Sequence, residues 1–220
     1  MKEFYLSNIT PWAPGPGDDE ELWEEWANNV IEIVQSKESP KLEYTDPLFR
    51  RRLSQITKMT VHVVHQLLEK THIKPDTKLV FTSLRGEIER EFTINKSLIE
   101  DNLILPAGFS LSVFNTPISS ATLAFGLKGG YSVIFPSKGD FTNAFKAAVS
   151  PVLAGSEETI IFVYADELVS EVYGDKRPEE NFPLAFSCII SSQKSKSGIC
   201  FDDFSTIPSS PLDFLRLLLN

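Results

Sequence analysis

The chain has 220 residues, of which 42% are hydrophobic and 23% charged, as is usual for a globular rather than a disordered protein. Asp and Glu number 30 against 21 Lys and Arg, and the net charge of −9 argues against broad nucleic-acid binding, which needs a cationic face. No apolar run approaches about 18 residues, so we expect no membrane span. The N-terminus lacks the apolar core of a signal peptide, and we expect a cytoplasmic protein.

Cysteine and histidine usage predicts neither a disulfide framework nor a metal centre. Cys188 and Cys200 have no CxxC or Cys/His neighbourhood. His62 and His65 lie three residues apart on a predicted helix, but no nearby cysteine or carboxylate completes a site, and His72 follows in a loop. We therefore expect no metal and no cofactor.

Hydrophobic periodicity and turn residues predict strands that alternate with helices. In chain order the expected elements are a strand over 4–9, an acidic helix over 18–29, a turn over 46–49, a helix capped by Ser54 with an apolar stripe from Ile56 to Leu68, a strand over 78–83, a helix from Gly86 to about Glu100, an extended segment over 109–115, a helix from Pro117 to Phe125, a strand over 131–136, a helix capped by Asp140 to about Leu153, a strand over 159–165, a strand over 183–191 and a last helix from Ser210. The continuously apolar strand 159–165 is expected at the centre of the sheet. This order predicts a single α/β domain over 1–220, a layered mixed β-sheet with helices on both faces.

The central segment, residues 109–149, carries the pattern that points to a function. It contains FSLSVFN ending at Asn115, a Gly126-Leu127-Lys128-Gly129 turn and the apolar strand 131–136. This order resembles the N-terminal half of β-ketoacyl synthases, which have the thiolase fold. Over nearly the whole chain, further features are similar to the β-ketoacyl synthase-like N-terminal domain family: Trp12, Trp26, Arg51-Arg52-Leu53-Ser54, Ser83 with Gly86-Glu87, and PLDFLRLL near the end. The resemblance implies a thiolase-like half-domain.

The sequence departs from the working enzymes at the nucleophile. The resemblance places the family's cysteine at Lys138, between Ser137 and Gly139, and no cysteine lies nearby. An ammonium at the positive end of a helix is repelled rather than activated, and Ser137 has no evident base beside it. The second half of complete synthases, which brings two decarboxylating histidines, has no counterpart in this sequence. We therefore expect no condensing activity and no catalytic residue.

Synthases of this fold dimerise through the strand before the cysteine, and an FxxSxxN segment of each partner closes the acyl tunnel of the other. The resemblance implies a non-catalytic, chain-length-factor-like subunit that forms a heterodimer with an active β-ketoacyl synthase in a fatty-acid-like or aryl polyene pathway. The expected tunnel and interface residues are Gly108, Ser112, Phe114, Asn115, Val133 and Phe135. Alternation along 109–115 predicts one face with Ser110, Ser112 and Phe114, and a second face, toward the domain's own core, with Phe109, Leu111 and Val113.

Two other functions stay open at this level. One is acyl transfer or thioester hydrolysis, with Ser137 or Cys188 as the nucleophile; the other is a self-associating scaffold with no tunnel role. Acyl carrier protein is a further candidate partner. The net charge of −9 disfavours docking of an acidic carrier protein except at Arg50-Arg51-Arg52, the one dense basic run.

Overall fold

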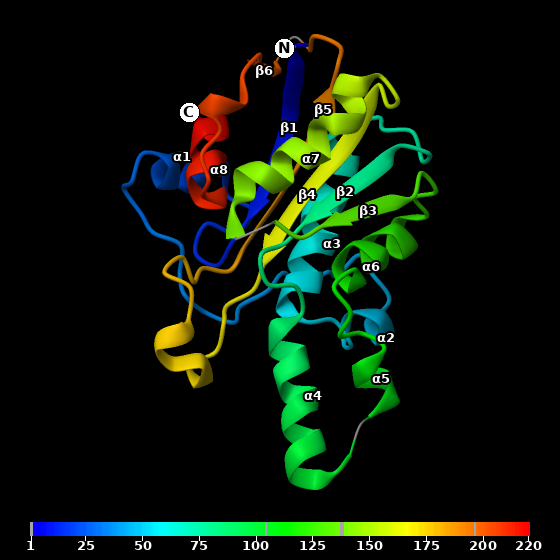
Figure 1. Cartoon of the computed structure of the whole chain (residues 1–220), viewed down its shortest axis with the longest axis vertical. Helices are drawn as coiled ribbons and strands as arrows, with labels where there is room; N and C mark the ends of the chain where they lie inside the picture. The colour runs from blue at the N-terminus through cyan, green and yellow to red at the C-terminus, as the bar shows by residue number, and fades with distance from the viewer. Residues whose placement is uncertain (1, 104, 137–138, 196) are drawn as a thin grey trace.

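Six strands form one mixed sheet in the computed structural model, which describes residues 2–103, 105–136, 139–195 and 197–220 (Figure 1). The strand order is β3-β2-β4-β5-β1-β6. The bounds are β1 Phe4–Trp12, β2 Lys78–Thr82, β3 Tyr131–Ile134, β4 Thr159–Asp166, β5 Leu184–Ser191 and β6 Ile199–Phe201. The β3, β2 and β4 strands are parallel, whereas β5 is antiparallel to both β4 and β1, and β6 is antiparallel to β1. The three parallel strands therefore end at one edge of the sheet, where the site residues gather.

Helices cover both faces of the sheet, as the sequence predicts. The bounds are α1 Glu20–Ala27, α2 Pro47–Arg50, α3 Gln55–Lys70, α4 Ile88–Asp101, α5 Pro106–Phe109, α6 Thr116–Phe125, α7 Phe141–Ala154 and α8 Pro211–Leu219, with short 3-10 turns η2 Glu171–Lys176 and η3 Phe204–Thr206. One buried cluster lies under α1, α7 and α8, and a second lies under α3 and α6 on the opposite face. None of the described helices combines the length and apolarity that a bilayer crossing requires.

Several helix boundaries follow from local capping chemistry. Ser54 accepts a hydrogen bond from the backbone N–H of Thr57, and Asp140 accepts one from Thr142, so α3 and α7 begin where the sequence predicts. Ser210 caps α8 in the same way. Gly126 ends α6 in the left-handed region, with φ of 63°, where glycine has no steric cost.

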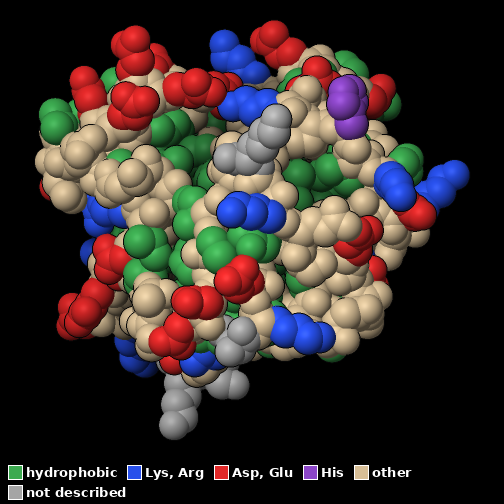
Figure 2. Space-filling model, turned by 90° about the horizontal axis from the view of Figure 1, so that it is seen from above, with side chains coloured by type: hydrophobic (Ala, Val, Ile, Leu, Met, Phe, Trp, Pro, Cys, Tyr) green, Lys and Arg blue, Asp and Glu red, His purple; other side chains and the backbone are tan. Residues whose placement is uncertain are grey.

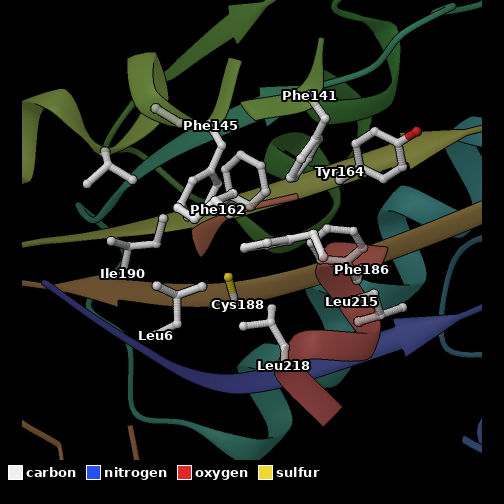
Figure 3. Close-up of a cluster of buried hydrophobic side chains, with 14 of the residues drawn as sticks. Leu6, Phe141, Phe145, Phe162, Tyr164, Phe186, Cys188, Ile190, Leu215 and Leu218 are labelled. Carbon is white, nitrogen blue, oxygen red and sulfur yellow. The ribbon is translucent and has the colours of Figure 1, made fainter. Parts of the chain in front are cut away.

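Aromatic side chains pack over the centre of the sheet (Figure 3). β4 is buried from its second residue onward, which confirms the predicted central strand. Phe145 of α7 packs on Phe162 of β4 with ring centroids 5.2 Å apart and on Phe214 of α8 at 4.7 Å. Burial of each phenylalanine stabilises the fold by roughly 1.5–3 kcal/mol. The α7 helix therefore has a fixed position behind the parallel strands.

The segment 109–115 is not extended, so this prediction is wrong. α5 occupies Pro106–Phe109, and tight turns follow it to Asn115. The Ser110 hydroxyl donates to the Ala107 carbonyl at 3.1 Å, and the Ser112 hydroxyl donates to the Phe109 carbonyl at 2.9 Å. Such local side-chain to backbone bonds compete with an extended chain. The predicted alternation of two faces along 109–115 is therefore wrong as well, because it requires an extended chain.

The helix α4 leaves the body of the molecule and projects beyond the sheet (Figure 1). None of its residues is buried. A helix in water is usually stabilised by burying one face, so α4 presents side chains that another surface can cover.

Candidate functional site

The edge strand β3 is the first component of the site. It pairs with β2 through Leu79↔Tyr131 to Thr82↔Ile134, and the described part of the chain places no strand on its other side. Val133 is half-buried against the cluster under α3 and α6, whereas Phe135, just beyond the strand, is 61% exposed. An open strand edge is a template for pairing with another chain.

The segment before α6 contacts β3 and the residue that follows it through aromatic and amide side chains. Phe114 packs edge-to-face on Phe135 at 5.6 Å, and the Asn115 amide donates to the Tyr131 hydroxyl at 2.9 Å. The Phe114 ring also lies on Gly86, whose φ is 62°, and a Cβ there would come within 2.5 Å of the ring. Phe114 and Phe135 are therefore brought together at the carboxyl end of β3, whereas Asn115 contacts Tyr131, the first residue of the strand.

The turn that carries Gly86 is fixed by a buried carboxylate that sequence reasoning missed. Asp166, at the end of β4, accepts hydrogen bonds from the Ser83 hydroxyl at 2.6 Å and the Tyr164 hydroxyl at 2.5 Å. It also accepts from the backbone N–H groups of the two residues after Ser83. Burial raises the pKa of Asp166. These contacts hold the support on which the Phe114 ring rests.

Two other expected tunnel residues lie elsewhere in the segment. Gly108 is in α5 and faces Ile94 of α4. Ser112 is only 8% exposed, and its hydroxyl donates to the Phe109 carbonyl, so its side chain braces the turn. Phe109 and Val113, which the alternation placed toward the core, are instead 58% and 48% exposed. The tight turns reverse the predicted orientation.

Many of the exposed large apolar side chains of the described residues belong to α4, α5, α6 and β3 or to residues beside these elements, and we call them the apolar stripe. The stripe consists of Leu98, Ile99, Leu103, Leu105, Phe109, Val113, Leu123 and Phe135. Exposed apolar side chains mark interaction sites where they form a patch.

The nucleophile position is described only in part, because Ser137 and Lys138 lie outside the described residues. Gly139 is described, with φ of 69°, and α7 begins two residues later. The Asp140 carboxylate accepts the backbone N–H of Thr142 at 2.9 Å, and the N–H of Phe141 donates to the Ser209 carbonyl at 3.2 Å. The first donors of α7 are therefore occupied, and a carboxylate lies where a thiolate or oxyanion would need positive potential.

The histidines are structural and distant from α7. The His62 Nε2 lies 2.6 Å from Asp18, and its Nδ1 lies 3.2 Å from the Tyr44 hydroxyl. His65 stacks on Tyr44 at 3.6 Å, and burial lowers the pKa of its imidazole. Both belong to α3, which covers the face opposite α7, and His72 is exposed. Within the described residues, no group of His, Cys, Asp and Glu side chains could hold a metal ion.

The alternative nucleophile Cys188 is sealed inside the molecule. It lies in β5 among Leu6, Ile190 and Leu218, and its side chain has no exposed area (Figure 3). Burial raises the pKa of the Cys188 thiol far above its usual value. A buried neutral thiol neither meets a substrate nor attacks one, so Cys188 does not serve as a nucleophile in this fold.

We expect only one of the two thiols to react in the folded protein. Cys200 is exposed on β6, whereas Cys188 is buried. A colorimetric disulfide reagent should label Cys200 within minutes, and Cys188 only after denaturant is added. Labelling of both thiols at equal rates in native buffer would contradict the packing around Cys188.

The surface charge is mixed on the face seen from above in Figure 2, where basic and acidic side chains are interspersed. The dense basic run lies at the end of α2, where Arg51 and Arg52 are exposed. Arg52 lines a hollow of about 570 Å³ together with apolar side chains of α2, α5 and α6, among them Leu48 and Leu123.

The fold and the site define the class of protein. A mixed sheet between two helical layers, with α7 following an edge strand, is the thiolase-like arrangement of ketosynthases. A ketosynthase (ApeO) in complex with its chain length factor (ApeC) from Xenorhabdus doucetiae matches at a TM-score of 0.79 and 22% identity, over 100% of this chain and 92% of that chain. The ishigamide ketosynthase/chain length factor matches at 0.68 and 9% identity, over 86% and 62%. AntDE:AntF, a type II PKS acyl-carrier protein in complex with its ketosynthase bound to the hexaketide, matches at 0.63 and 14%, over 86% and 63%.

A comparison of the sequence with models of protein families identifies the family. Residues 23–207 match the model of the β-ketoacyl synthase N-terminal domain. The chain belongs to this family. No curated protein matches it.

Proposed function

We propose that the chain is a non-catalytic ketosynthase-like subunit that pairs with an active β-ketoacyl-ACP synthase and shapes its acyl tunnel, as a chain-length factor does. The observation that carries the proposal is the unpaired edge of β3 beside the apolar stripe. The likeness to a ketosynthase–chain length factor complex supports this kind of partner. The pathway we propose is a fatty-acid-like one, with aryl polyene synthesis as its specific form.

Pairing through β3 would join two sheets into one. Its backbone groups on the open side, which water can otherwise satisfy, would pair with a strand that aligns there. Within the apolar stripe, Phe135 directly follows β3 and is 61% exposed. A partner that takes the edge therefore also covers Phe135, and a fold-related synthase offers a matching strand edge.

Catalysis by this chain is disfavoured by the start of α7. A condensing enzyme must hold a thiolate and a developing oxyanion at a helix N-terminus. Here the Asp140 carboxylate and the Ser209 carbonyl take the first N–H groups. The condensation reaction is therefore assigned to the partner synthase, and this chain contributes side chains that shape the acyl tunnel.

The tunnel role is assigned to the cluster at the carboxyl end of β3. Phe114 and Phe135 present aromatic surface there, and the adjacent Val113 side chain is half-exposed. Apolar walls of this kind suit an alkyl or polyene chain, which gains free energy when it leaves water. We assign Ser112 and Gly108 to bracing the same wall from within.

Acyl carrier protein is proposed to dock at the hollow beside α2. The Arg52 guanidinium lies at its rim, and Leu48 and Leu123 line it. An acidic amphipathic helix would place carboxylates on the arginine and apolar side chains in the hollow.

Two competing functions are distinguished by one experiment. A scaffold that only self-associates would use the same β3 edge for a second copy of the chain, and an acyltransferase would need Ser137 as its nucleophile. Co-expression with the β-ketoacyl synthase of the same gene neighbourhood, followed by size-exclusion with light scattering, should yield a 1:1 heterodimer. Homodimers alone would favour the scaffold, and stable malonyl loading of the isolated chain would favour the acyltransferase.

We expect no condensation by the chain alone, and we expect that Lys138→Cys does not restore it. The Asp140 carboxylate and the Ser209 carbonyl already take the first donors of α7, and α3 keeps His62 and His65 on the opposite face. A radiolabelled malonyl/acyl assay of the wild type and the variant should give counts at background. Turnover by either protein without a partner would contradict the assignment.

A further inference from the structure

The base of the projecting helix α4 is held by a buried carboxylate. The Glu87 side chain, just before α4, has no exposed area. Its Oε1 accepts hydrogen bonds from the hydroxyls of Ser54 at 2.6 Å and Thr57 at 2.5 Å, both at the start of α3. Its Oε2 pairs with the Arg90 Nε at 3.0 Å. Glu87 thereby ties α4 to α3 and has its own counter-charge.

A second buried carboxyl group ties α4 to the chain after β4. Glu167 is 2% exposed, and its Oε1 accepts the backbone N–H of Glu89, in the first turn of α4, at 3.1 Å. The Glu89 carboxylate in turn accepts the backbone N–H of Ser170 at 2.6 Å and pairs with Lys37 at 2.7 Å. The 167–170 segment and α4 therefore hold each other at two points.

Glu167 differs from Glu87 because no cation pairs with it in the described part of the chain. The surrounding cations have other partners. Lys37 pairs with Glu89, and Arg90 pairs with Glu87. Lys58 donates to the Ser39 hydroxyl, and Arg85 donates to the backbone carbonyls of Glu167 and Glu180. Two acids, Glu87 and Glu89, act on Glu167 from α4 and the turn before it. The neighbouring Asp166 accepts hydrogen bonds from the 83–85 turn. Burial and the adjacent Glu87 raise the pKa of Glu167 to about 8.

The direction of α4 depends on this base. Beyond it, the main contacts are the Phe92 ring on Tyr173 at 5.8 Å and Ile94 facing Gly108, and no residue of the 14 in α4 is buried. At about 1.5 Å per residue the helix is a lever of about 21 Å. A small rotation of α4 about its base therefore displaces Leu98 and Ile99, which belong to the apolar stripe, several times further than it displaces the residues at the base.

We infer that Glu87 and Glu167 form a proton-dependent clamp on α4, which is closed while Glu167 is neutral and loosens when Glu167 ionises beside Glu87. The hollow of about 410 Å³ lined by Glu167, Lys37, Lys58 and Arg90 gives the proton a route to water. The inference concerns the free chain and stands without the proposed partner.

The direction of the pH effect follows from linkage. The closed state binds the Glu167 proton more tightly than the open state, whose carboxyl has an ordinary pKa near 4.5. The stabilisation of the closed state is therefore complete below about pH 4.5 and is lost as the pH rises through about 8. Above that pH both states are ionised, and no further change is expected.

Amide hydrogen exchange in α4, corrected for the intrinsic rate, tests the clamp in the isolated chain. Between pH 5 and 8 we expect the opening equilibrium of the wild type to grow by about 400-fold, and to level off above that pH. Glu167→Gln, which mimics the neutral carboxyl, should change by less than about threefold over the same range. Glu91→Gln removes an exposed acid of the same helix and should keep the wild-type profile.

A wild-type profile that is flat, or a Glu167→Gln profile that follows the wild type, would overturn the clamp. Should Glu167→Gln fail to fold by circular dichroism, Glu87→Gln provides the second readout. Removal of the neighbouring charge should make the loss of protection end at lower pH, and an unchanged profile would again refute the inference.

Discussion

Placing a lysine on the open edge of β3 is expected to weaken association with the partner synthase by at least about 100-fold, or about 2.8 kcal/mol. Ser132→Lys is the sharper variant because Ser132 is exposed, and its replacement leaves the core intact. Val133→Lys should have the same effect on association, with some loss of monomer stability because Val133 packs against the cluster under α3 and α6. A lysine on an edge strand opposes pairing because its charge must leave water.

The matched control for the edge is the other end of the sheet. Cys200→Lys places the same charge on β6, whose side chain at this position is also exposed, and should leave association unchanged. Isothermal titration or co-purification with the synthase measures each variant, and circular dichroism reports the fold. Wild-type affinity of Ser132→Lys would remove β3 from the interface, and an equal loss with Cys200→Lys would show that the charge acts nonspecifically.

Val113→Trp is expected to shorten the product of the assembled pair without abolishing synthesis. Val113 is half-exposed beside Phe114, at the end of β3 where the wall is proposed. Each methylene that no longer fits a cavity forfeits about 0.8 kcal/mol, or about fourfold in occupancy, so a larger side chain should bias length steeply. Mass spectrometry of the products is the measurement, and Val113→Ala should shift the distribution toward longer chains.

Ser112→Trp tests whether Ser112 lines the proposed tunnel wall or only supports the turn behind it. The Ser112 side chain is buried and bonded to the Phe109 carbonyl, so a tryptophan there must first break the turn after α5. We expect this variant to lose association or stability rather than to tune length. An assembled Ser112→Trp pair with shortened product would instead make Ser112 a direct wall residue, and an unchanged length in an assembled Val113→Trp pair would remove Val113 from the wall.

The elements that the sequence predicts correctly are those with local causes. Ser54, Asp140 and Ser210 start helices because their side chains cap N–H groups two or three residues away. The apolar run of β4 marks a central strand because a strand covered on both faces has no polar side to show. β3 itself was also expected, as an apolar strand over 131–136, and the structure places it at the edge of the sheet.

The errors occur where two local patterns compete. FSLSVFN alternates apolar and polar residues, as a strand does, yet the Ser110 and Ser112 hydroxyls close turns on Ala107 and Phe109. With no neighbouring strand to pair with, the turns prevail, and Phe109 and Val113 face outward. β6 was missed because its three residues form a strand only through pairing with β1.

The sequence by itself therefore determined the layered α/β class, the helix starts and the missing cysteine, because each depends on residue type and on neighbours within a turn or two. Only the tertiary structure decided which side chains meet at the site. Gly86 under Phe114, Asp140 and Ser209 on the first donors of α7, and Glu167 beside Glu87 join residues that are mostly far apart in the chain. Their proximity arises from sheet order and helix packing, which bury these groups in environments that no single segment encodes.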